Sequence, residues 1–542
     1  MGGINSAKRL FIRFIIPEFF RFEKDEFLRY AEIMNIPQEI KNILEKLSEA
    51  GFEAYIVGGA ARDLMLENSP AGGPKDWDIA TNAKPEKIQE IFPDSFCENK
   101  FGTVSVKTDS DEESLKIVEI TTFRTDEKYT DKRHPDSVNF AKTIKEDLAR
   151  RDFTINAIAL EIGIKNQESR IKEKNRENFS VPFIIHNSSF KIIDPFGGQE
   201  DLKNRIIRAV GHPDERFSED ALRLMRAVRL AMELDFEVES KTKEAIQKNA
   251  GSLRFIAKER IRDEFKKMIM TPRAFEGILL LRELGLLEFV IPELEKGFGV
   301  AQNRHHIYTI FEHGVFSLKF AAEKKYNLIV RLAALLHDIA KPQAKRGEGP
   351  DATFYNHDIM GARAASRILE RLRFSRQEIE EVANLVRHHM FVYDVGAVSE
   401  AGVRRLLRRA GPENMKNLLA LRVADRLGSG VPKAQPYRLR HFQYMVEKVQ
   451  KDPISVKMLK INGNDLMENL KIEPGPKIGA ILDVLLAEAI EEPKKNKKEL
   501  LEKRAKELVM VDLAKLRELA KERIEEKKEE DDQVIKGKYW VK

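Results

Sequence analysis

The chain has 542 residues, of which 42% are hydrophobic and 34% are charged. One hydrophobic core stops growing near roughly 250–300 residues, so we expect several domains. The single cysteine, Cys97, excludes an internal disulfide, and no apolar run reaches the ~20 residues that a membrane helix needs. The net charge of +6 is compatible with nucleic-acid binding but is weak evidence for it. We therefore expect a cytoplasmic protein that does not contact a membrane.

Strands and helices are mixed only in the first part of the chain. Residues 1–38 form an N-terminal extension of unknown role, and residues 39–205 form a domain of the α+β class. Residues 163–190 are polar and then briefly apolar, which indicates an inserted, partly disordered loop. The predicted strands have the sequences AYIVGG (54–59), DWDIAT (76–81), GTVSVKT (102–108) and LKIVEITTF (115–123).

Beyond residue 205 the apolar residues recur at helical spacing almost to the end of the chain. This pattern predicts an all-α region with no further sheet. Pro432 and Pro436 mark the last boundary. We divide the region into a helical neck (206–300), a histidine-rich domain (301–430) and a helical tail (431–542).

The segment from Gly58 to Thr81 points to phosphate chemistry. Gly58 and Gly59 follow a buried strand and open a helix, where backbone amides can approach a phosphate closely. Asp76 and Asp78 lie two residues apart on the next predicted strand, so their carboxylates project to one face. Two such carboxylates repel unless a cation lies between them, and hard oxygen ligands suit Mg²⁺. This combination predicts transfer of a nucleotidyl group, against the alternative of two solvent-facing turn aspartates.

Two further positions extend this site. Glu119, in the middle of the strand KIVEITTFR, is the candidate for a third carboxylate ligand, although a solvated strand position is nearly as good an interpretation. The motif RRDFTINAIAL at 150–160 places a basic pair before Asp152 and Asn156, which can bind phosphate and ribose. Alone, an Arg-Arg-Asp run more often covers a solvated surface.

The motif SEDALRLMRAVR, at 218–229, indicates how a base could be selected. Asp220 and Arg223 are three apart on a predicted helix and so share one face. Asp220 can only accept hydrogen bonds and Arg223 can only donate them. Cytosine and adenine each offer an amino group beside a ring nitrogen acceptor, whereas uracil and guanine present a carbonyl in place of the amine. The pair therefore predicts selection of C and A, unless it is an ordinary helical ion pair.

Together these motifs resemble the class II tRNA nucleotidyltransferase and bacterial poly(A) polymerase superfamily. The resemblance covers about residues 50–290 and implies a polymerase-β-like head with a small mixed sheet. It also implies that residues 121–140 are a flexible loop that helps to switch from C to A addition. The resemblance implies that Gly59 and Arg62 hold the triphosphate, that Asp76 and Asp78 hold Mg²⁺, that Arg151 contacts the nucleotide, and that Asp220 and Arg223 select the base with Arg226 and Arg229 nearby. Our further candidates for nucleotide binding are Gly58, Asp63, Asp152 and Asn156.

A cluster of histidines and aspartates follows in the helical region. Seven of the eleven histidines lie between residues 305 and 389. Imidazole and carboxylate ligands suit Mn²⁺, Co²⁺, Ni²⁺ or Fe better than a structural zinc, which prefers thiolates. The candidate ligands are His313, His337, Asp338 and Asp425, with His357 and His388 for a second metal position.

The order H…HD…D resembles the HD phosphohydrolase superfamily, and Lys341 in HDIAKP matches its pattern. Some bacterial tRNA nucleotidyltransferases carry such a domain after the neck, and the resemblance implies 2′,3′-cyclic phosphodiesterase and phosphatase activity. An HD fold that binds RNA but hydrolyses nothing is the rival interpretation. Residues 461–490 resemble the helical tail of these chains, which implies phosphate contacts to tRNA through Lys and Arg.

These observations predict a CCA-adding tRNA nucleotidyltransferase that uses CTP, ATP and Mg²⁺ and carries a second, metal-dependent phosphohydrolase centre. Its partner is tRNA, and we expect a monomer or a homodimer. A poly(A) polymerase, or an enzyme that adds only A or only CC, is the alternative within the same class. A phosphohydrolase whose head only binds RNA is the alternative from another class.

Overall fold

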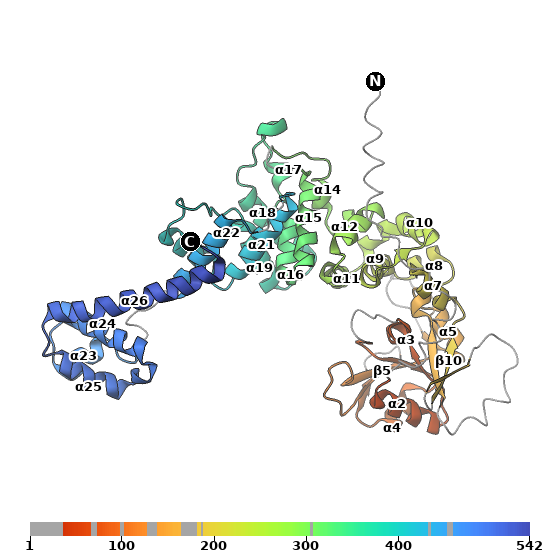
Figure 1. Cartoon of the computed structure of the whole chain (residues 1–542). Helices are drawn as coiled ribbons and strands as arrows, with labels where there is room; N and C mark the ends of the chain where they lie inside the picture. The colour runs from red at the N-terminus through yellow and green to blue at the C-terminus, as the bar shows by residue number, and fades with distance from the viewer. Residues whose placement is uncertain are drawn as a thin grey trace. The chain divides into compact units, whose positions relative to one another are not determined.

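The computed structural model describes residues 36–541 except 67–72, 98–101, 127–137, 164–181, 186–187, 304–306, 432–434 and 452–458. The chain divides into two compact units, Met1–Ile256 and Ala257–Lys542. The first unit combines a sheet with helices, and the second is built from helices (Figure 1). The expected α+β fold, with a small mixed sheet followed by helical regions, is confirmed. No helix among the described residues is long and apolar enough to span a membrane.

The sheet of the first unit has the strand order β3-β4-β5-β2-β1-β8-β10-β9. Neighbouring strands are antiparallel except β2 and β5, which run in parallel. Strand β2 is central in the sheet, where it pairs with β1 on one side and with β5 on the other. The strands are β1 (Ala54–Val57), β2 (Asp78–Thr81), β3 (Ser95–Cys97), β4 (Thr103–Lys107), β5 (Ile117–Thr122), β8 (Ala159–Gly163), β9 (Pro182–Ile185) and β10 (Ser188–Ile193).

Each face of this sheet packs in its own core. Helices α2 (Gln38–Glu49) and α4 (Pro85–Ile91) cover one face, where Ile56, Ile79 and Ile120 are fully buried. Helix α5 (Ile144–Ala149) and the short 3-10 helix η2 (Thr154–Asn156) pack on the other face. Side chains alternate along a strand, so Asp78, next to Ile79 in β2, belongs to this second face.

The inserted segment, residues 163–190, is predicted to be a loop, but part of it forms strands. Its described part, after Gly163, forms β9 and the first residues of β10, which extend the sheet beyond β8. The sequence signal was weak because β9 is a short apolar run that follows a long polar stretch. Part of the predicted flexible loop lies outside the described residues, and its two ends form the hairpin strands β6 (Arg124–Asp126) and β7 (Val138–Phe140).

The rest of the first unit is helical apart from one short parallel pair, β11 (Ile206–Ile207) and β12 (Glu237–Val238). This pair corrects the expectation that no strand follows residue 205. The helices are α3 (Gly58–Met65), α7 (Gly198–Asn204), α8 (Pro213–Glu219), α9 (Leu222–Leu234) and α10 (Ser240–Asn249).

The described part of the second unit is built from helices and their connections, with one isolated β-bridge between Arg346 and Thr353. Helix α15 packs against α16 and α21, and α18 packs against α19. The helices up to residue 451 are α11 (Lys258–Met270), α12 (Ala274–Glu283), α13 (Leu287–Val290), α14 (Pro292–Glu295), α15 (Ile310–Glu323), α16 (Leu328–Leu336), α17 (Lys341–Ala344), α18 (His357–Arg371), α19 (Arg376–His388), α20 (Glu400–Ala410), α21 (Met415–Gly428) and α22 (Tyr437–Lys451).

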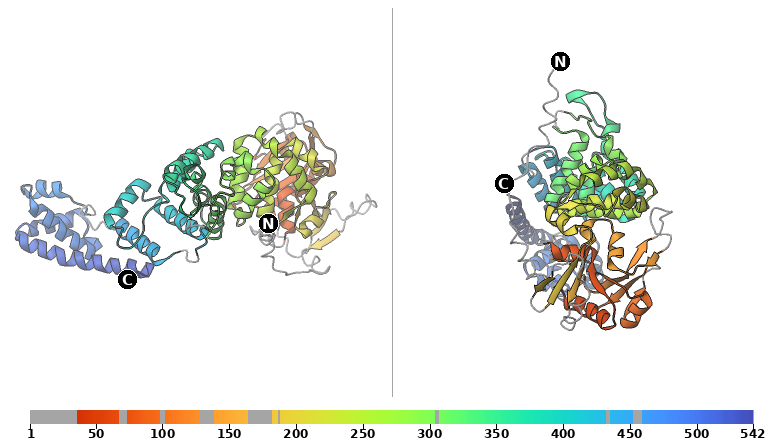
Figure 2. Two further views of the ribbon diagram at one scale, coloured as in Figure 1. Left: turned by 90° about the horizontal axis from the view of Figure 1, so that it is seen from above. Right: turned by 90° about the vertical axis from the view of Figure 1, so that its right-hand side faces the viewer.

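A separate helical core closes the chain. Helices α23 (Gly463–Leu470), α24 (Pro476–Glu491) and α25 (Lys498–Leu508) pack around Ile481, Leu485 and Leu516. The long helix α26 (Leu513–Tyr539) begins in this core and extends away from it, as the views in Figure 2 show. Its far end contacts α22: Lys538 and Tyr539 both donate hydrogen bonds to Glu447 of α22.

Candidate active site and metal centre

Three carboxylates lie on β2, just before it, and on its neighbour β5. Asp78 is the first residue of β2 and lies opposite Glu119 of β5 in the parallel register, so their side chains share a face. Asp76 precedes the strand in a bend, which corrects its prediction as a strand residue. Burial raises the pKa of Asp78, and the nearby carboxylate of Asp76 raises it further, against the cations of Arg151 and Arg226. These oxygen donors fit the expected Mg²⁺.

The backbone comes unusually close to these groups at Gly58. This residue ends the turn from β1 into α3 with φ of 68°, a conformation that favours glycine. A Cβ atom added there would lie 3.0 Å from Asp78 Oδ2 and 2.9 Å from Arg151 Nη1. The turn, the carboxylate and the guanidinium therefore converge, and glycine is what permits it.

A chain of polar contacts joins the three motifs. Arg62 Nη1 donates to Asn156 Oδ1 over 2.9 Å, and Asn156 Nδ2 donates to Asp152 Oδ1 over 3.2 Å. Arg226 Nη2 lies 2.8 Å from Asp152 Oδ2. Burial alone would raise the pKa of Asp152, but Arg226, Arg223 and its hydrogen bonds outweigh burial and lower it. Asp152 is therefore an anion that organises cations at the site.

Asp147 is a contributor that sequence reasoning missed. Its fully buried carboxylate lies 2.8 Å from Arg150 Nη2 and 3.1 Å from Arg151 Nη2. The pKa of Asp147 is lowered because these two cations outweigh the effect of burial. The signal in the sequence was an acid three and four residues before an Arg pair at the end of a helix.

The base-selecting pair has a different backbone from the one expected. Asp220 lies between α8 and α9 in an extended conformation, and its carboxylate accepts the Leu222 N–H over 3.0 Å. The prediction of one continuous helix is therefore wrong, because an aspartate that satisfies a helix N-terminus favours the capping region. Arg223 belongs to α9, and it donates to Glu219, a residue that the sequence analysis did not single out, and to the Arg150 carbonyl.

The remaining candidate residues for nucleotide binding separate into two groups. Asp63 accepts from Arg62 Nε over 2.7 Å, so it lies beside the polar chain. Gly59 follows Gly58 in the first turn of α3. Arg229 pairs instead with Glu233, 2.7 Å away and further along α9.

The second unit brings together a set of buried histidines and aspartates from separate helices. One group has ligand atoms of His313, His337 and Asp425 within 4.8 Å of one another, and a second has those of Asp338, His357 and His389. His388 belongs to neither group, which corrects its prediction as a ligand. His388 and His389 are adjacent at the end of α19, and it is the His389 ring that lies among the ligands of the second group.

The histidine rings are held in the tautomer that a metal needs. Nδ1 of His337, His357 and His389 lies 2.9, 2.7 and 2.7 Å from a backbone carbonyl oxygen. A carbonyl can only accept, so each Nδ1 carries a hydrogen, and each ring presents Nε2 to a metal once any proton there has been displaced.

The Nε2 atoms of the cluster histidines converge in two pairs. Those of His313 and His337 are 3.0 Å apart, and those of His357 and His389 are 3.3 Å apart. Asp338 Oδ1 is buried and accepts no hydrogen bond among the described residues. Converging nitrogen and oxygen donors of this kind fit a divalent transition metal.

The charge balance of the cluster agrees with this fit. Burial opposes a charge on His337, but Asp338 and Asp425 outweigh burial and raise its pKa to about 10. Burial, and then repulsion from His337, lowers the pKa of His389 to about 3. Lys341 Nζ lies 2.6 Å from Asp338 Oδ2. The negative charge of the aspartates is thus balanced by cations, a role that a divalent metal can take over.

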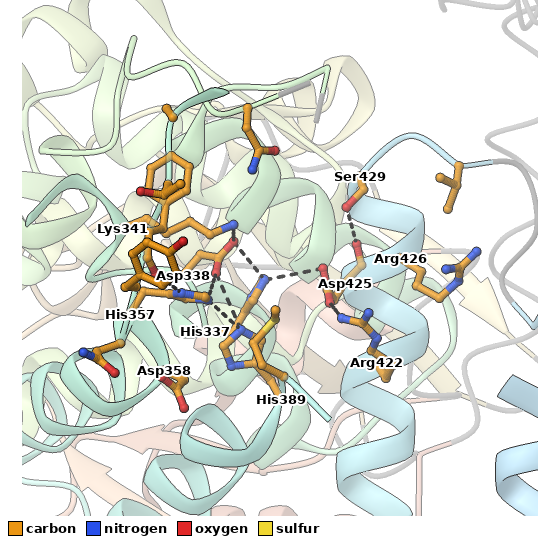
Figure 3. A pocket seen from close by; sticks show the side chains of 18 residues that line it. His337, Asp338, Lys341, His357, Asp358, His389, Arg422, Asp425, Arg426 and Ser429 are labelled. Atoms are coloured by element: carbon orange, nitrogen blue, oxygen red, sulfur yellow. Dashed lines mark hydrogen bonds and ion pairs between the residues drawn. The ribbon is translucent and has the colours of Figure 1, made fainter. Parts of the chain in front are cut away.

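The cluster opens into a cavity of about 740 Å³. Figure 3 shows His337, His357 and His389 gathered around Asp338, with Asp425 reaching them from α21. A volume of this size is typical of small-molecule sites, which span about 300–1,000 Å³. The cavity therefore has room for a ligand well beyond a water or a phosphate.

Family models match three parts of the chain. The poly A polymerase head domain matches residues 54–208. The probable RNA and SrmB-binding site of polymerase A matches residues 235–298, and a putative domain 2 of tRNA nucleotidyltransferase matches residues 353–505.

Relatives span most of the chain. The CCA-adding enzyme of Ligilactobacillus salivarius is 34% identical over 484 residues, 88% of this chain and 98% of that protein. The A-adding tRNA nucleotidyltransferase of Deinococcus radiodurans is 34% identical over 365 residues, 65% and 76% of the two chains. The crystal structure of the Bacillus stearothermophilus CCA-adding enzyme in complex with CTP matches with a TM-score of 0.52 and 29% identity, over 87% of this chain and 96% of that one. The chain therefore belongs to the tRNA nucleotidyltransferase and poly(A) polymerase superfamily of nucleotidyltransferases.

Proposed function

We propose that the protein is a CCA-adding tRNA nucleotidyltransferase, which transfers CMP, CMP and AMP in sequence to the 3′ end of tRNA. The observation that carries the proposal is the convergence of Gly58, Asp78 and Arg151 with the polar chain from Arg62 to Arg226. The relatives named CCA-adding enzyme support the choice of substrate.

In the proposed reaction the tRNA 3′-hydroxyl attacks the α-phosphate of CTP or ATP and pyrophosphate leaves. Asp76, Asp78 and Glu119 would hold Mg²⁺, which supplies positive charge to the reacting phosphates when bound. The amides at the Gly58 turn and the guanidiniums of Arg62 and Arg151 would orient the triphosphate. This division of labour leaves the base itself to Asp220, between α8 and α9, and to Arg223 on α9.

Base choice falls to Asp220 and Arg223. The Asp220 carboxylate would accept the amino group of cytosine or adenine, and Arg223 would donate to the ring nitrogen beside it. Glu219 and the Arg150 carbonyl hold the Arg223 guanidinium by its other donors, so that it is presented in a fixed orientation. A carbonyl in place of the amine would leave the half-buried Asp220 carboxylate without the donor it needs, and an acceptor left unsatisfied in the complex commonly costs about 1–3 kcal/mol.

An A-adding enzyme is the alternative that one relative favours. Purified protein is given three tRNAs, which end before CCA, after the first C and after CC, with CTP, ATP and Mg²⁺. A CCA-adding enzyme completes all three and stops. An A-adding enzyme extends only the third, a CC-adding enzyme stops before A, and a poly(A) polymerase makes long A tracts.

We infer a second activity for the cluster of the second unit: an HD-type phosphohydrolase that removes a 2′,3′-cyclic or terminal phosphate from RNA ends. His313, His337 and Asp425 would hold one divalent metal, and Asp338, His357 and His389 another. A bound metal would supply an activated water for attack on phosphorus. Such trimming would expose the hydroxyl that nucleotide addition requires.

Two substitutions separate the proposed activities. Asp76→Ala should abolish nucleotide addition and leave phosphate release from a 2′,3′-cyclic nucleotide intact. His337→Ala should have the opposite effect. Loss of both activities in either variant would contradict the two-site proposal. Absence of hydrolysis by the parent protein with Mn²⁺, Co²⁺, Ni²⁺ and Fe²⁺ would favour an inactive HD fold that binds RNA.

A further inference from the structure

Most of the cavity beside the metal cluster is not needed for a phosphate. Its lining extends along α21 from Arg422 and Asp425 to Arg426 and Ser429. Figure 3 shows Asp425 directed toward the histidines, whereas Arg426 projects to the other side of α21. The cavity therefore extends beyond the metal ligands to Arg426, a residue to which the proposed metal sites give no role.

Arg426 differs in its charge balance from the other cations of the lining. Lys341 pairs with Asp338 over 2.6 Å, and Arg422 pairs with Asp425 over 2.6 Å. In the described part of the chain, the polar partner of Arg426 is the neutral hydroxyl of Tyr393, which accepts from Nη1 over 2.9 Å. Arg426 Nε is buried and has no hydrogen-bond partner there. A half-buried guanidinium that no carboxylate neutralises is a ready site for an anion.

Tyr393 gives this guanidinium a fixed position. Its ring also lies 5.1 Å from the Arg422 guanidinium, so the tyrosine stands between the two arginines of α21. The lining also has exposed apolar side chains: Tyr355 is 74% exposed and Met390 is 59% exposed. Exposed aromatic and thioether groups at a cavity rim offer a surface for a nucleobase.

We propose that Arg426 forms a second phosphate subsite, which binds the phosphodiester on the 5′ side of the terminal nucleotide of RNA. The terminal phosphate lies at the metal cluster, and the base lies against Tyr355 and Met390. This inference rests on the proposed phosphohydrolase centre and deepens it, because it makes the centre selective for RNA ends over nucleotides that carry one phosphate. A free nucleotide with two phosphates shares this chemistry and is the other source to be distinguished.

The test measures binding by calorimetry with full-length protein in EDTA, where metal-dependent hydrolysis cannot occur. The probes are adenosine 3′-phosphate, adenosine 3′,5′-bisphosphate and the dinucleotide ApA with a 3′-phosphate. The parent protein should bind the second and third probes about tenfold more tightly than the first, since a charge-assisted hydrogen bond is worth at least about this factor. Arg426→Ala should remove this preference. Arg376→Ala, which deletes an arginine whose side chain is 92% exposed on α19, should keep it.

The nucleotide site of the head can also take up these probes, so only the change caused by Arg426→Ala is informative. An equal affinity loss for all three probes, or none, would overturn the subsite. A preference for the bisphosphate without one for the dinucleotide would overturn its assignment to RNA. Retained metal content and melting temperature of Arg426→Ala establish that the variant is folded. Failure of hydrolysis in a separate Mn²⁺ assay refutes the phosphohydrolase proposal without affecting these binding results.

Discussion

Replacement of Gly58 by alanine should inactivate nucleotide addition through one methyl group. The added Cβ would lie 2.9 Å from Arg151 Nη1, closer than Cβ atoms approach, and 3.0 Å from Asp78 Oδ2, which is a very tight contact, so the guanidinium must shift and the carboxylate must give way slightly. The positive φ of 68° adds a backbone strain of roughly 1–2 kcal/mol. A misplacement near 1 Å of catalytic groups commonly costs about 100-fold in rate. We therefore expect a large loss of activity with a small loss of stability.

Gly51→Ala is the matched control. Gly51 has φ of 86° and no atom within 4 Å of an added Cβ, so alanine there introduces strain without a clash. Both variants should melt at a similarly reduced temperature, and only Gly58→Ala should lose incorporation of labelled CTP into tRNA. If Gly58→Ala retains the activity of Gly51→Ala, the proposed convergence of turn, carboxylate and guanidinium is refuted.

Three further substitutions test other parts of the molecule. Asp147→Asn should lower the melting temperature at pH 7. Because the native pKa of Asp147 is lowered, its stabilising contribution is fully present above the unfolded pKa of about 4, and the difference between the two proteins should disappear as the pH falls through the native pKa. His389→Ala should reduce Mn²⁺ bound after dialysis, measured by mass spectrometry, whereas its neighbour His388→Ala should not; equal losses would contradict the assignment. Asp220→Ala should raise UMP incorporation relative to CMP by about tenfold or more, and unchanged exclusion of UTP would refute the role of Asp220 in base choice.

Much of the head could be predicted because its signals are local. The apolar run before Gly58 and the two-residue spacing of Asp76 and Asp78 placed a phosphate turn beside carboxylates, and the structure has β1, α3 and β2 in that order. Glu119 was an open choice in the sequence. The parallel register of β2 and β5 now puts it opposite Asp78, a long-range pairing that no local pattern encodes.

The structure differs from the prediction where tertiary contacts or helix capping determine the position of a residue. Asp220 has an acceptable spacing for a helix, yet its carboxylate takes the Leu222 N–H and interrupts the helix. His388 and His389 are equivalent in composition, and the packing of α19 against α18 and α16 determines which one turns inward. Asp147 and Glu219 act through arginines rather than on a ligand, so a search for ligand-type motifs passes over them.

The three carbonyl contacts of the metal cluster have a common origin. His337 donates to Ala334, His357 to Phe354 and His389 to Val386, in each case the residue three positions earlier. Ring orientation is therefore encoded within each segment's own preceding turn, independently of the other helices. When the helices pack together, they bring together histidine ligands whose rings already have the required orientation. Metal capture then requires no ring flip and little loss of side-chain entropy, and a substitution that disturbs one of these turns should weaken the centre from outside the cavity.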